Sequence, residues 1–338
     1  MQPISASGEE QVNLIGIDVD SRNLVCRIRR DGKDHPEKIF TNDAAGFGKL
    51  IRWATQRGAQ ARVCMEATGV YSMPLALALH QAPAIEVMVV NPKVIKHFTT
   101  ANLQRGKTDS LDAASILEFL QRMPFRPWQP PSDEVLELQH ICRRIVQLNT
   151  ELTRERNRHK QARRLGSWGR VVAHDTQVNM NHLQRRIDHL ETTALALVES
   201  VPELAERLRL LTSTTGIAAK TGPRILAELM ALPDGMRPEQ WVAHAGLDPR
   251  AHESGSSTHK PRRISKAGNR YLRDALYFPA LVACRYDPNV KAYYDKLIER
   301  GKKPKQVLVA VMRKLLLAIW GMFKSNQPWN GQKFYQIA

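Results

Sequence analysis

Strand-like and helical segments alternate over the first 125 residues of this 338-residue chain, and the alternation stops at a proline-rich break, 124–131. The chain opens with an apolar, β-branched run that continues as an alternating one, 12–30, and this pattern predicts a β-hairpin or meander. Two more strand-like runs, 61–65 and 85–90, are each followed by a helical segment. Strands that alternate with helices predict an α/β domain.

Two long helical patterns follow the break. Apolar residues recur in them at spacings of three and four, which predicts two helices that pack along a common seam. The partner of each helix is either the other helix, in a hairpin, or a second chain, in a coiled coil, and the pattern does not choose between them. The seam residues are Leu138, Ile141, Ile145, Leu148 and Leu152 in the first helix and Leu183, Ile187, Leu190, Ala194 and Leu197 in the second.

The formal net charge of +17, from 50 Lys and Arg against 33 Asp and Glu, favours a polyanionic partner. The apolar run 307–323 is interrupted by Arg313 and Lys314. Since a bilayer helix needs about 20 largely uncharged residues, we expect no membrane segment. The cysteines form no CxxC pair, so we expect reduced, buried thiols in a cytosolic protein rather than disulfides or a zinc site. They are Cys26, Cys64, Cys142 and Cys284.

Four acidic residues stand at positions that require explanation. Asp18 lies inside an apolar strand-like run, where a charge is costly unless it has a partner. Glu66 ends a second such run, and Asp109 and Asp112 open a helical segment three residues apart, on one face. The helix dipole alone explains acids at a helix start. The order of all four, however, matches that of ribonuclease-H-like nuclease domains.

Converging carboxylates would repel each other by about 4 kcal/mol per pair at about 4 Å and an effective dielectric constant of about 20. Hard divalent cations with oxygen ligands remove that cost, so the acids predict Mg²⁺, with Mn²⁺ as a substitute. Two such ions about 3.5–4 Å apart can stabilise the attacking and leaving oxygens of a phosphodiester. Asp20 follows Asp18 by two residues and is either a fifth ligand or a turn residue, of which we favour the turn.

A turn-rich segment, 245–260, contains Ser254, Ser256 and Ser257. Such a segment is ordinarily a flexible loop, because a serine needs an adjacent base or metal to act as a nucleophile. Upstream, a glycine-containing turn opens a helix at 215–222. It resembles half of a helix-hairpin-helix element, which would present backbone N–H groups to a phosphate, and an ordinary capped helix start explains it equally well.

Basic residues crowd the end of the first long helix and the segment after the serines. A solvated basic face is the simpler interpretation, but their density favours contact with nucleic acid. The residues that we expect to make this contact are Arg154, Arg158, Lys160, Arg163, Arg164, Lys260, Arg262, Arg263, Lys266 and Arg270.

Seven motifs occur in one order: GIDVD, CMEATGVY, VNPKVIKHF, KTDSLDA, TTGIAAKTG, AHAGLDPRAHESGSS and RRISKAGNRYLRDALY. Together they resemble the transposases of the insertion sequence 110/1111 family, recombinases guided by a bridge RNA, over nearly the whole chain. The resemblance implies an α/β RNase H-like (RuvC-like) domain at 1–125. It further implies an α-helical coiled-coil connector at 126–200 and a mainly α-helical transposase domain, with the serine segment, at 201–338.

The resemblance also implies the site. The metal-binding acids fall on Asp18, Glu66, Asp109 and Asp112, and the catalytic serine falls on Ser254. The family forms a covalent phosphoserine–DNA intermediate in an active site built from two subunits. Implied partners are donor and target DNA, a noncoding bridge RNA and further copies of the chain, as a dimer that assembles to a tetramer. The expected location is the cytoplasm, on the nucleoid.

Two other functions fit part of the sequence. A Mg²⁺-dependent nuclease of the Holliday-junction type, which hydrolyses DNA with water, needs the four acids and no serine. A non-catalytic nucleic-acid-binding protein accounts for the charge of +17 but not for four acids placed in so basic a chain.

Overall fold

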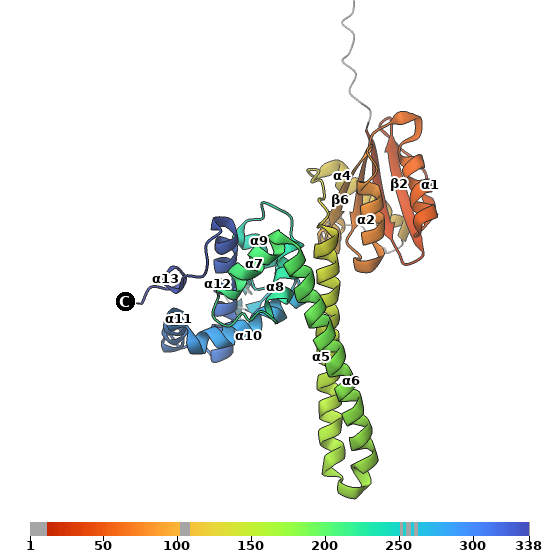
Figure 1. The fold of residues 1–338 in the computed structure, drawn as a ribbon. Helices are drawn as coiled ribbons and strands as arrows, with labels where there is room; N and C mark the ends of the chain where they lie inside the picture. Colours follow the sequence, from red (N-terminus) through yellow and green to blue (C-terminus); the bar gives the residue numbers. More distant parts are fainter. Residues whose placement is uncertain (1–11, 102–108, 251–252, 255–257, 260–262, 338) are drawn as a thin grey trace, which may run out of the picture. The chain divides into compact units, whose positions relative to one another are not determined.

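The computed structural model describes residues 12–101, 109–250, 253–254, 258–259 and 263–337. The chain divides into two compact units, Met1–Pro130 and Pro131–Ala338 (Figure 1). The first is a sheet with helices and the second is mainly helical, which confirms the fold class expected from the sequence.

A mixed sheet forms the centre of the first unit. β1 pairs antiparallel with β2 and parallel with β5, which pairs parallel with β6. β3 and β4 both pair antiparallel with β2, so the order is β3-β2-β1-β5-β6 with β4 beside β2. This is the RNase H-like arrangement. The strands are β1 (Asn13–Val19), β2 (Asn23–Arg30), β3 (Lys33–Asp34), β4 (Lys38–Thr41), β5 (Ala61–Glu66) and β6 (Ile85–Val90).

Helices cover both faces of this sheet. Ile17 and Met65 pack on one face against α1 and α2, whereas Cys64 and Met88 pack on the other against α3 and α4. An edge-to-face contact between Phe98 of α3 and Phe119 of α4, with ring centroids 5.3 Å apart, joins the second pair of helices. The helices are α1 (Ala44–Ala54), α2 (Met73–His80), α3 (Pro92–Ala101) and α4 (Asp109–Arg122), with short 3₁₀ turns at Gln56–Gly58 and Gly69–Tyr71.

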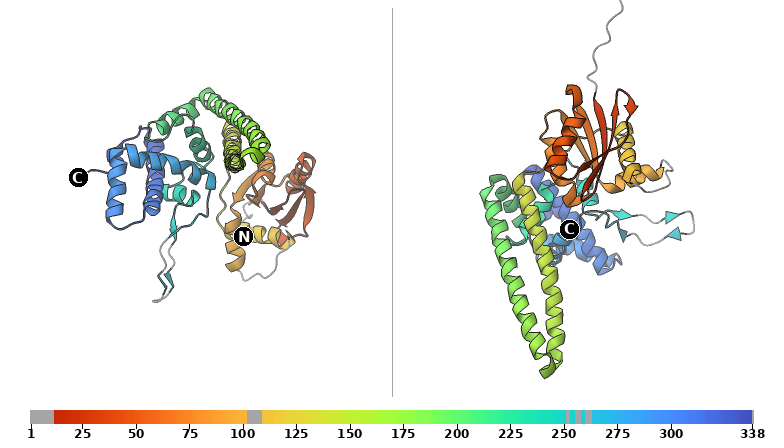
Figure 2. Two further views of the ribbon diagram at one scale, coloured as in Figure 1. Left: turned by 90° about the horizontal axis from the view of Figure 1, so that it is seen from below. Right: turned by 90° about the vertical axis from the view of Figure 1, so that its right-hand side faces the viewer.

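The second unit begins with a long antiparallel hairpin of two helices, α5 (Asp133–Arg164) and α6 (Arg170–Ser200) (Figure 2). The middle of the predicted seam is buried between them, so the intramolecular alternative is realised there, while a coiled coil with a second chain stays a prediction. Leu138 and Ala194 of the seam pack instead in the main core of the second unit. Gly169 allows the tight connection between α5 and α6, since a Cβ there would lie 1.9 Å from the Ala162 carbonyl oxygen. The seam cluster consists of Ile145, Leu148, Leu152, Leu183 and Ile187.

The rest of the second unit packs around α12 (Pro304–Ser325). Among the described residues, α12 is the helix that is long and apolar enough to cross a membrane, with a mean hydropathy of 1.6 over 18 residues. Its apolar face lies in the main core of this unit, as in a core helix of a globular domain. The other helices are α7 (Pro202–Thr212), α8 (Gly222–Met230), α9 (Pro238–His244), α10 (Arg270–Tyr286), α11 (Pro288–Glu299) and α13 (Gly331–Phe334).

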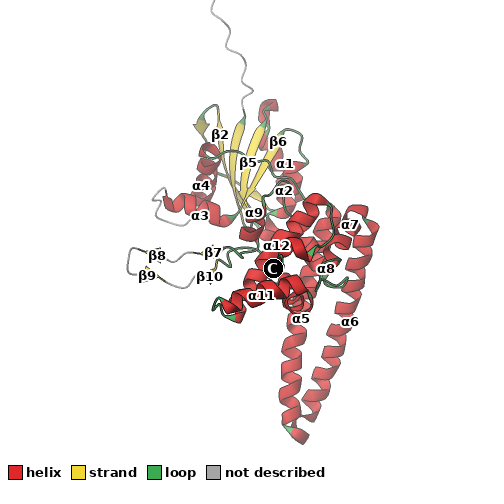
Figure 3. Cartoon of the chain, turned by 90° about the vertical axis from the view of Figure 1, so that its left-hand side faces the viewer, coloured by secondary structure: helices red, strands yellow, loops and turns green. Residues whose placement is uncertain are grey.

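The serine segment forms strands where the sequence predicts a loop. Two short antiparallel ladders, β7 with β10 and β8 with β9, follow one another along a narrow ribbon (Figure 3). We call these four strands the serine arm. Backbone pairing between its two sides satisfies peptide groups that a loop would leave to water. The strands are β7 (Pro249–Arg250), β8 (Glu253–Ser254), β9 (Thr258–His259) and β10 (Arg263–Ile264).

Candidate catalytic site

Two of the four predicted acids stand side by side on the sheet. The parallel register of β1 and β5 pairs Gly16 with Cys64 and Ile17 with Met65, so the next residues, Asp18 and Glu66, are neighbours. Successive side chains of a strand point to opposite faces. Since Ile17 and Met65 face α1 and α2, both acids lie on the face of α4. Both are partly exposed.

Gly16 allows α4 to approach β1 closely. A Cβ at this position would lie 2.4 Å from the Leu117 amide nitrogen and 2.5 Å from the Ala113 carbonyl oxygen. The sequence analysis did not single out Gly16. A glycine inside a strand pattern was nevertheless a usable signal, because it often marks the close approach of another backbone.

The direction of α4 places its first turn beside Asp18. Near the end of α4, Gln121 accepts a hydrogen bond of 2.5 Å from Arg29, which stands opposite Leu14 at the start of β1. The helix therefore runs antiparallel to β1, and its first turn lies toward the carboxyl end of that strand. Asp112 is in this turn and is half-buried, and Asp109 begins the helix, although its side chain lies outside the described residues.

The four predicted acids would offer a metal ion only oxygen atoms as ligands. Burial, with a smaller contribution from the charge of Glu66, raises the pKa of the Cys64 thiol to about 12, so this neighbour stays protonated and is a poor metal ligand. Carboxylates suit hard cations such as Mg²⁺ and Mn²⁺. Among the described side chains, which leave out that of Asp109, no three acidic, histidine or cysteine groups form a metal site. The fit to the expected ion therefore rests on the oxygen chemistry of the acids and not on a formed cluster.

The other cysteines agree with the expectation of reduced thiols. All four are free, and Cys26 and Cys142 are buried like Cys64, whereas Cys284 is only half-buried. Burial raises the pKa of the Cys142 thiol to about 12 and that of Cys284 to about 11.

Asp20 lies in the turn between β1 and β2, as favoured from the sequence. Its backbone N–H donates a 2.9 Å hydrogen bond to the Asn23 carbonyl oxygen. Its backbone carbonyl oxygen accepts one of 2.7 Å from the side-chain amide of Asn42. The side chain is exposed.

Ser254 belongs to the second unit, whereas the four acids belong to the first. It lies in β8 and pairs with Thr258 of β9. The side chain of Ser254, and the whole of Ser256 and Ser257, lie outside the described residues.

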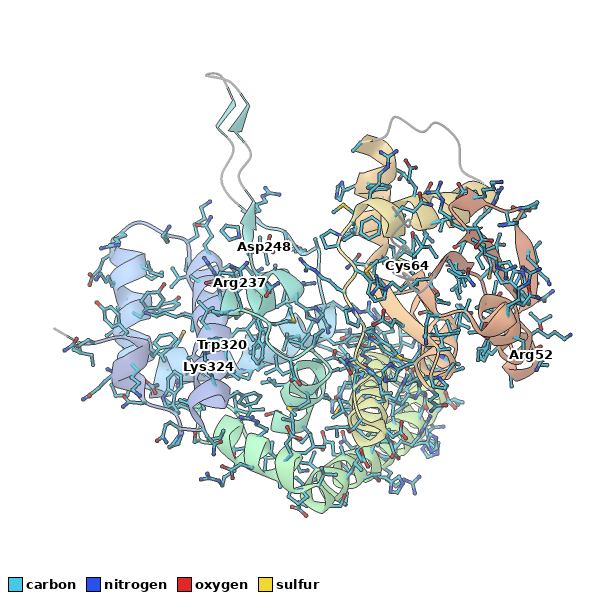
Figure 4. The ribbon with its side chains drawn as sticks, turned by 90° about the horizontal axis from the view of Figure 1, so that it is seen from above. Arg52, Cys64, Arg237, Asp248, Trp320 and Lys324 are labelled. Carbon is cyan, nitrogen blue, oxygen red and sulfur yellow. The ribbon has the colours of Figure 1, made fainter. Side chains whose placement is uncertain are left out.

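Backbone hydrogen bonds join the two segments that carry the serine arm, 244–248 and 265–269, which we call its root. The two segments lie side by side, with Asp248 on the first of them (Figure 4). Gly268 permits this approach, since a Cβ there would lie 1.9 Å from the His244 carbonyl oxygen. The bonds run from the amides of Ser265, Lys266 and Asn269 to the carbonyl oxygens of Asp248 (2.9 Å), Gly246 (3.1 Å) and His244 (2.6 Å).

A buried carboxylate ties this root to the helical hairpin. Glu228 of α8 is 1% exposed and accepts two hydrogen bonds from Arg143 of α5, of 2.8 and 2.9 Å. It also accepts one of 3.2 Å from Gln139 and one of 2.6 Å from Asn269, which caps α10. The sequence analysis missed this group, although an acid inside the apolar segment ILAELM signals a buried partner.

The predicted nucleic-acid contacts are exposed wherever the structure describes them. Arg154, Arg158 and Arg186 line a cleft of about 430 Å³ between α5 and α6. Arg186 comes from the other helix of the hairpin and was not among the expected contacts, and Glu151 and Glu155 line the same cleft. Exposed predicted residues are Arg154, Arg158, Lys160, Arg163, Arg164, Arg263, Lys266 and Arg270, while Lys260 and Arg262 lie outside the described residues.

Two family models match the chain. One, for the DEDD transposases of IS110, matches residues 15–162, and one, for the transposases of the IS116/IS110/IS902 family, matches residues 208–295. The pilin gene-inverting protein of Moraxella bovis is 30% identical over 328 residues, which are 94% of this chain and 97% of that protein. The chain belongs to the IS110 family of transposases.

Other relatives agree with this assignment. The pilin gene-inverting protein of Moraxella lacunata is 30% identical over 325 residues, 94% of this chain and 97% of that protein. An uncharacterized protein of insertion element IS110 from Streptomyces coelicolor is 29% identical over 145 residues, 43% of this chain and 34% of that protein. As an IS110 family transposase, the chain is a DNA-binding recombinase, and its DEDD domain implies a divalent metal.

One substitution tests the close packing beneath this site. We expect Gly16→Ala to destabilise the first unit by about 1–3 kcal/mol, the range for an overpacked core, and to displace α4 with its acids. Gly48→Ala in α1 is the matched control. The nearest atom there is the Arg52 guanidinium at 3.7 Å, so alanine should be neutral or stabilise the helix. Chemical unfolding and a recombination assay measure both effects, and equal stability of the two variants would contradict the packing argument.

Proposed function

We propose that this transposase cuts and rejoins DNA strands through a covalent ester between Ser254 and DNA. In this proposal Asp18, Glu66, Asp109 and Asp112 hold Mg²⁺. The supporting observation is that a carboxylate face on an RNase H-like sheet and a serine on a separate β-ribbon occur in one chain. Its relatives from Moraxella are named for gene inversion, which requires both cutting and rejoining.

The serine explains how rejoining needs no external energy source. Attack by the Ser254 Oγ on phosphorus replaces one phosphodiester bond with a serine phosphodiester, and the sugar oxygen leaves as a hydroxyl. An incoming sugar hydroxyl then reverses the step and releases the serine. Mg²⁺ held by the acids would reduce the cost of negative charge on the phosphoryl oxygens. The residues of the arm root orient Ser254.

We also propose that an RNA guides this transposase and that several subunits assemble to form its active site. A noncoding bridge RNA pairs with donor and target DNA, and the active site joins the acids of one subunit to the serine of another, in a dimer that assembles to a tetramer on the nucleoid in the cytoplasm. The charge of +17 and the exposed arginines of the helical hairpin suit a protein that holds nucleic-acid backbones while base pairing chooses the sequence.

Trapping the covalent intermediate tests the serine. Denaturation during the reaction should capture a protein–DNA adduct with the natural chain, and Ser254→Ala should abolish both the adduct and recombination. Ser256→Ala, two residues further on, is the control and should still form the adduct. The alternative is a Holliday-junction-type nuclease that uses water. Cleavage by Ser254→Ala at the natural rate, with no adduct from either protein, would establish that alternative.

A further inference from the structure

A cleft of about 480 Å³ lies in the second unit, bordered by α7, α12 and the loop between α8 and α9. Arg237, which begins α9, and Trp320 and Lys324, both of α12, lie close together there (Figure 4). The volume falls within the range of small-molecule sites, about 300–1,000 Å³. It is separate from the serine arm and from the basic face of the hairpin.

Aromatic rings form the wall of this cleft. Trp241 is buried, and its ring meets that of Phe323 edge to face with centroids 6.1 Å apart. Trp320 is half-buried, and its indole N–H donates a 2.9 Å hydrogen bond to the Met236 carbonyl oxygen. The hydrogen bond fixes the plane of this ring, so a flat ligand would meet a preorganised surface.

Cations cover the aromatic rings and border the opening. The Lys324 ammonium lies 4.9 Å from the Trp320 ring centroid, and the Arg207 guanidinium lies 5.0 Å from that of Phe323. Arg207 is also held by a 2.6 Å hydrogen bond to the Phe323 carbonyl oxygen. Lys324 and Arg237 are exposed, so their charged groups can move to an incoming anion.

Two carboxylates, Glu203 and Asp234, complete the lining. Carboxylates repel phosphate but accept hydrogen bonds from the amino groups of bases, as Asp and Glu do with cytosine. A purely anionic ligand therefore does not fit the cleft. A ligand with a flat face, N–H donors at one edge and an anionic group at another does.

We propose that this cleft binds one unpaired nucleotide of the nucleic acid on which the transposase acts. The base stacks on Trp320, and the Lys324 ammonium leaves the ring face to contact the phosphate together with Arg237. A base within a duplex has both faces covered by its neighbours, so only a nucleotide out of the helix enters. The amino edges of adenine, cytosine and guanine suit Glu203 and Asp234 better than thymine or uracil does.

The test uses the full chain and 12-nucleotide single strands that carry one 2-aminopurine, a fluorescent base with an amino group. We expect its fluorescence to be quenched on binding to the natural chain and to Trp320→Phe, which keeps an aromatic face. Trp320→Leu keeps an apolar side chain without an aromatic face and should bind about 10-fold more weakly or worse, because stacking on an aromatic side chain contributes about 1–3 kcal/mol per base. DNA and RNA versions of the strand identify which nucleic acid supplies the nucleotide.

A second pair of variants keeps the test valid if Trp320→Leu unfolds. Lys324→Ala should lower the salt dependence of single-strand binding by about one phosphate contact. Lys302→Ala removes the same charge from the exposed loop between α11 and α12 and should lower it less. Equal effects of the two lysine variants, or equal quenching in a duplex and in a single strand, would overturn the proposal.

Discussion

Replacing Asp18 with asparagine is expected to abolish recombination while leaving the fold intact. Asparagine has nearly the same shape but no negative charge, so the proposed Mg²⁺ site would lose a carboxylate. A metal ion contributes several kcal/mol to a phosphoryl transition state. A loss of about 4 kcal/mol lowers the rate about a thousandfold. Strand exchange on a supercoiled substrate measures the rate, and calorimetric titration with Mn²⁺ measures the binding.

Asp20→Asn is the matched control for this prediction. The same substitution two residues downstream falls on an exposed turn residue whose backbone, rather than its side chain, holds the turn through Asn23 and Asn42. Recombination by this variant should remain close to that of the natural chain. If Asp18→Asn recombines as fast as Asp20→Asn, the face of α4 is not the catalytic face.

The strands β1, β2, β5 and β6 of the first unit were predictable because each follows from local pattern, whereas β3 and β4 were not expected. The expected strand 61–65 is extended by one residue, to Glu66, and the helical segment that Asp109 and Asp112 were expected to open is α4, which begins at Asp109. The placement of the predicted acids near one another in space was not predictable in the same way. The adjacency of Asp18 and Glu66 depends on β1 pairing with β5, and the position of Asp112 depends on the direction of α4. Both depend on contacts between residues far apart in the sequence, which local patterns do not specify.

The helical hairpin shows the same limit. Its seam followed from apolar periodicity, but a seam does not identify its partner, and only the structure shows α5 packed on α6. The serine arm differs from the predicted loop for a related reason. Of the four paired residues only Thr258 favours a strand, so the ladder between Glu253 and His259 could not be predicted from the propensity of either strand.

Removal of the Glu228 carboxylate is expected to destabilise the second unit strongly. Glu228→Ala leaves the Arg143 guanidinium without its carboxylate and removes the acceptor of Gln139 and Asn269. Breaking a buried ion pair costs about 3–5 kcal/mol. The Arg143 side chain is 33% exposed and can partly rehydrate, so we expect about 3 kcal/mol, or about 6–12 °C in the melting temperature of a unit of this size.

The matched control is an exposed ion pair in the same unit. Glu206 and Arg209 of α7 lie 2.7 Å apart with side chains 39% and 66% exposed, so Glu206→Ala should leave the melting temperature nearly unchanged. The double substitution Arg143→Met with Glu228→Leu should recover part of the lost stability, because no buried charge remains unpaired, while Gln139 and Asn269 still lack their acceptor.

Loss of Glu228 should also loosen the root of the serine arm. Its hydrogen bond to Asn269 holds the residue that caps α10 and whose amide binds the His244 carbonyl oxygen. Burial lowers the pKa of His244, so its ring is neutral at pH 7. Its Nε2 accepts a 3.3 Å hydrogen bond from the side-chain amide of Asn269. In the double variant, faster hydrogen exchange at the Asn269 amide and slow recombination, despite partly recovered stability, would show that Glu228 positions the arm. Full recombination by that variant would reduce Glu228 to a structural role.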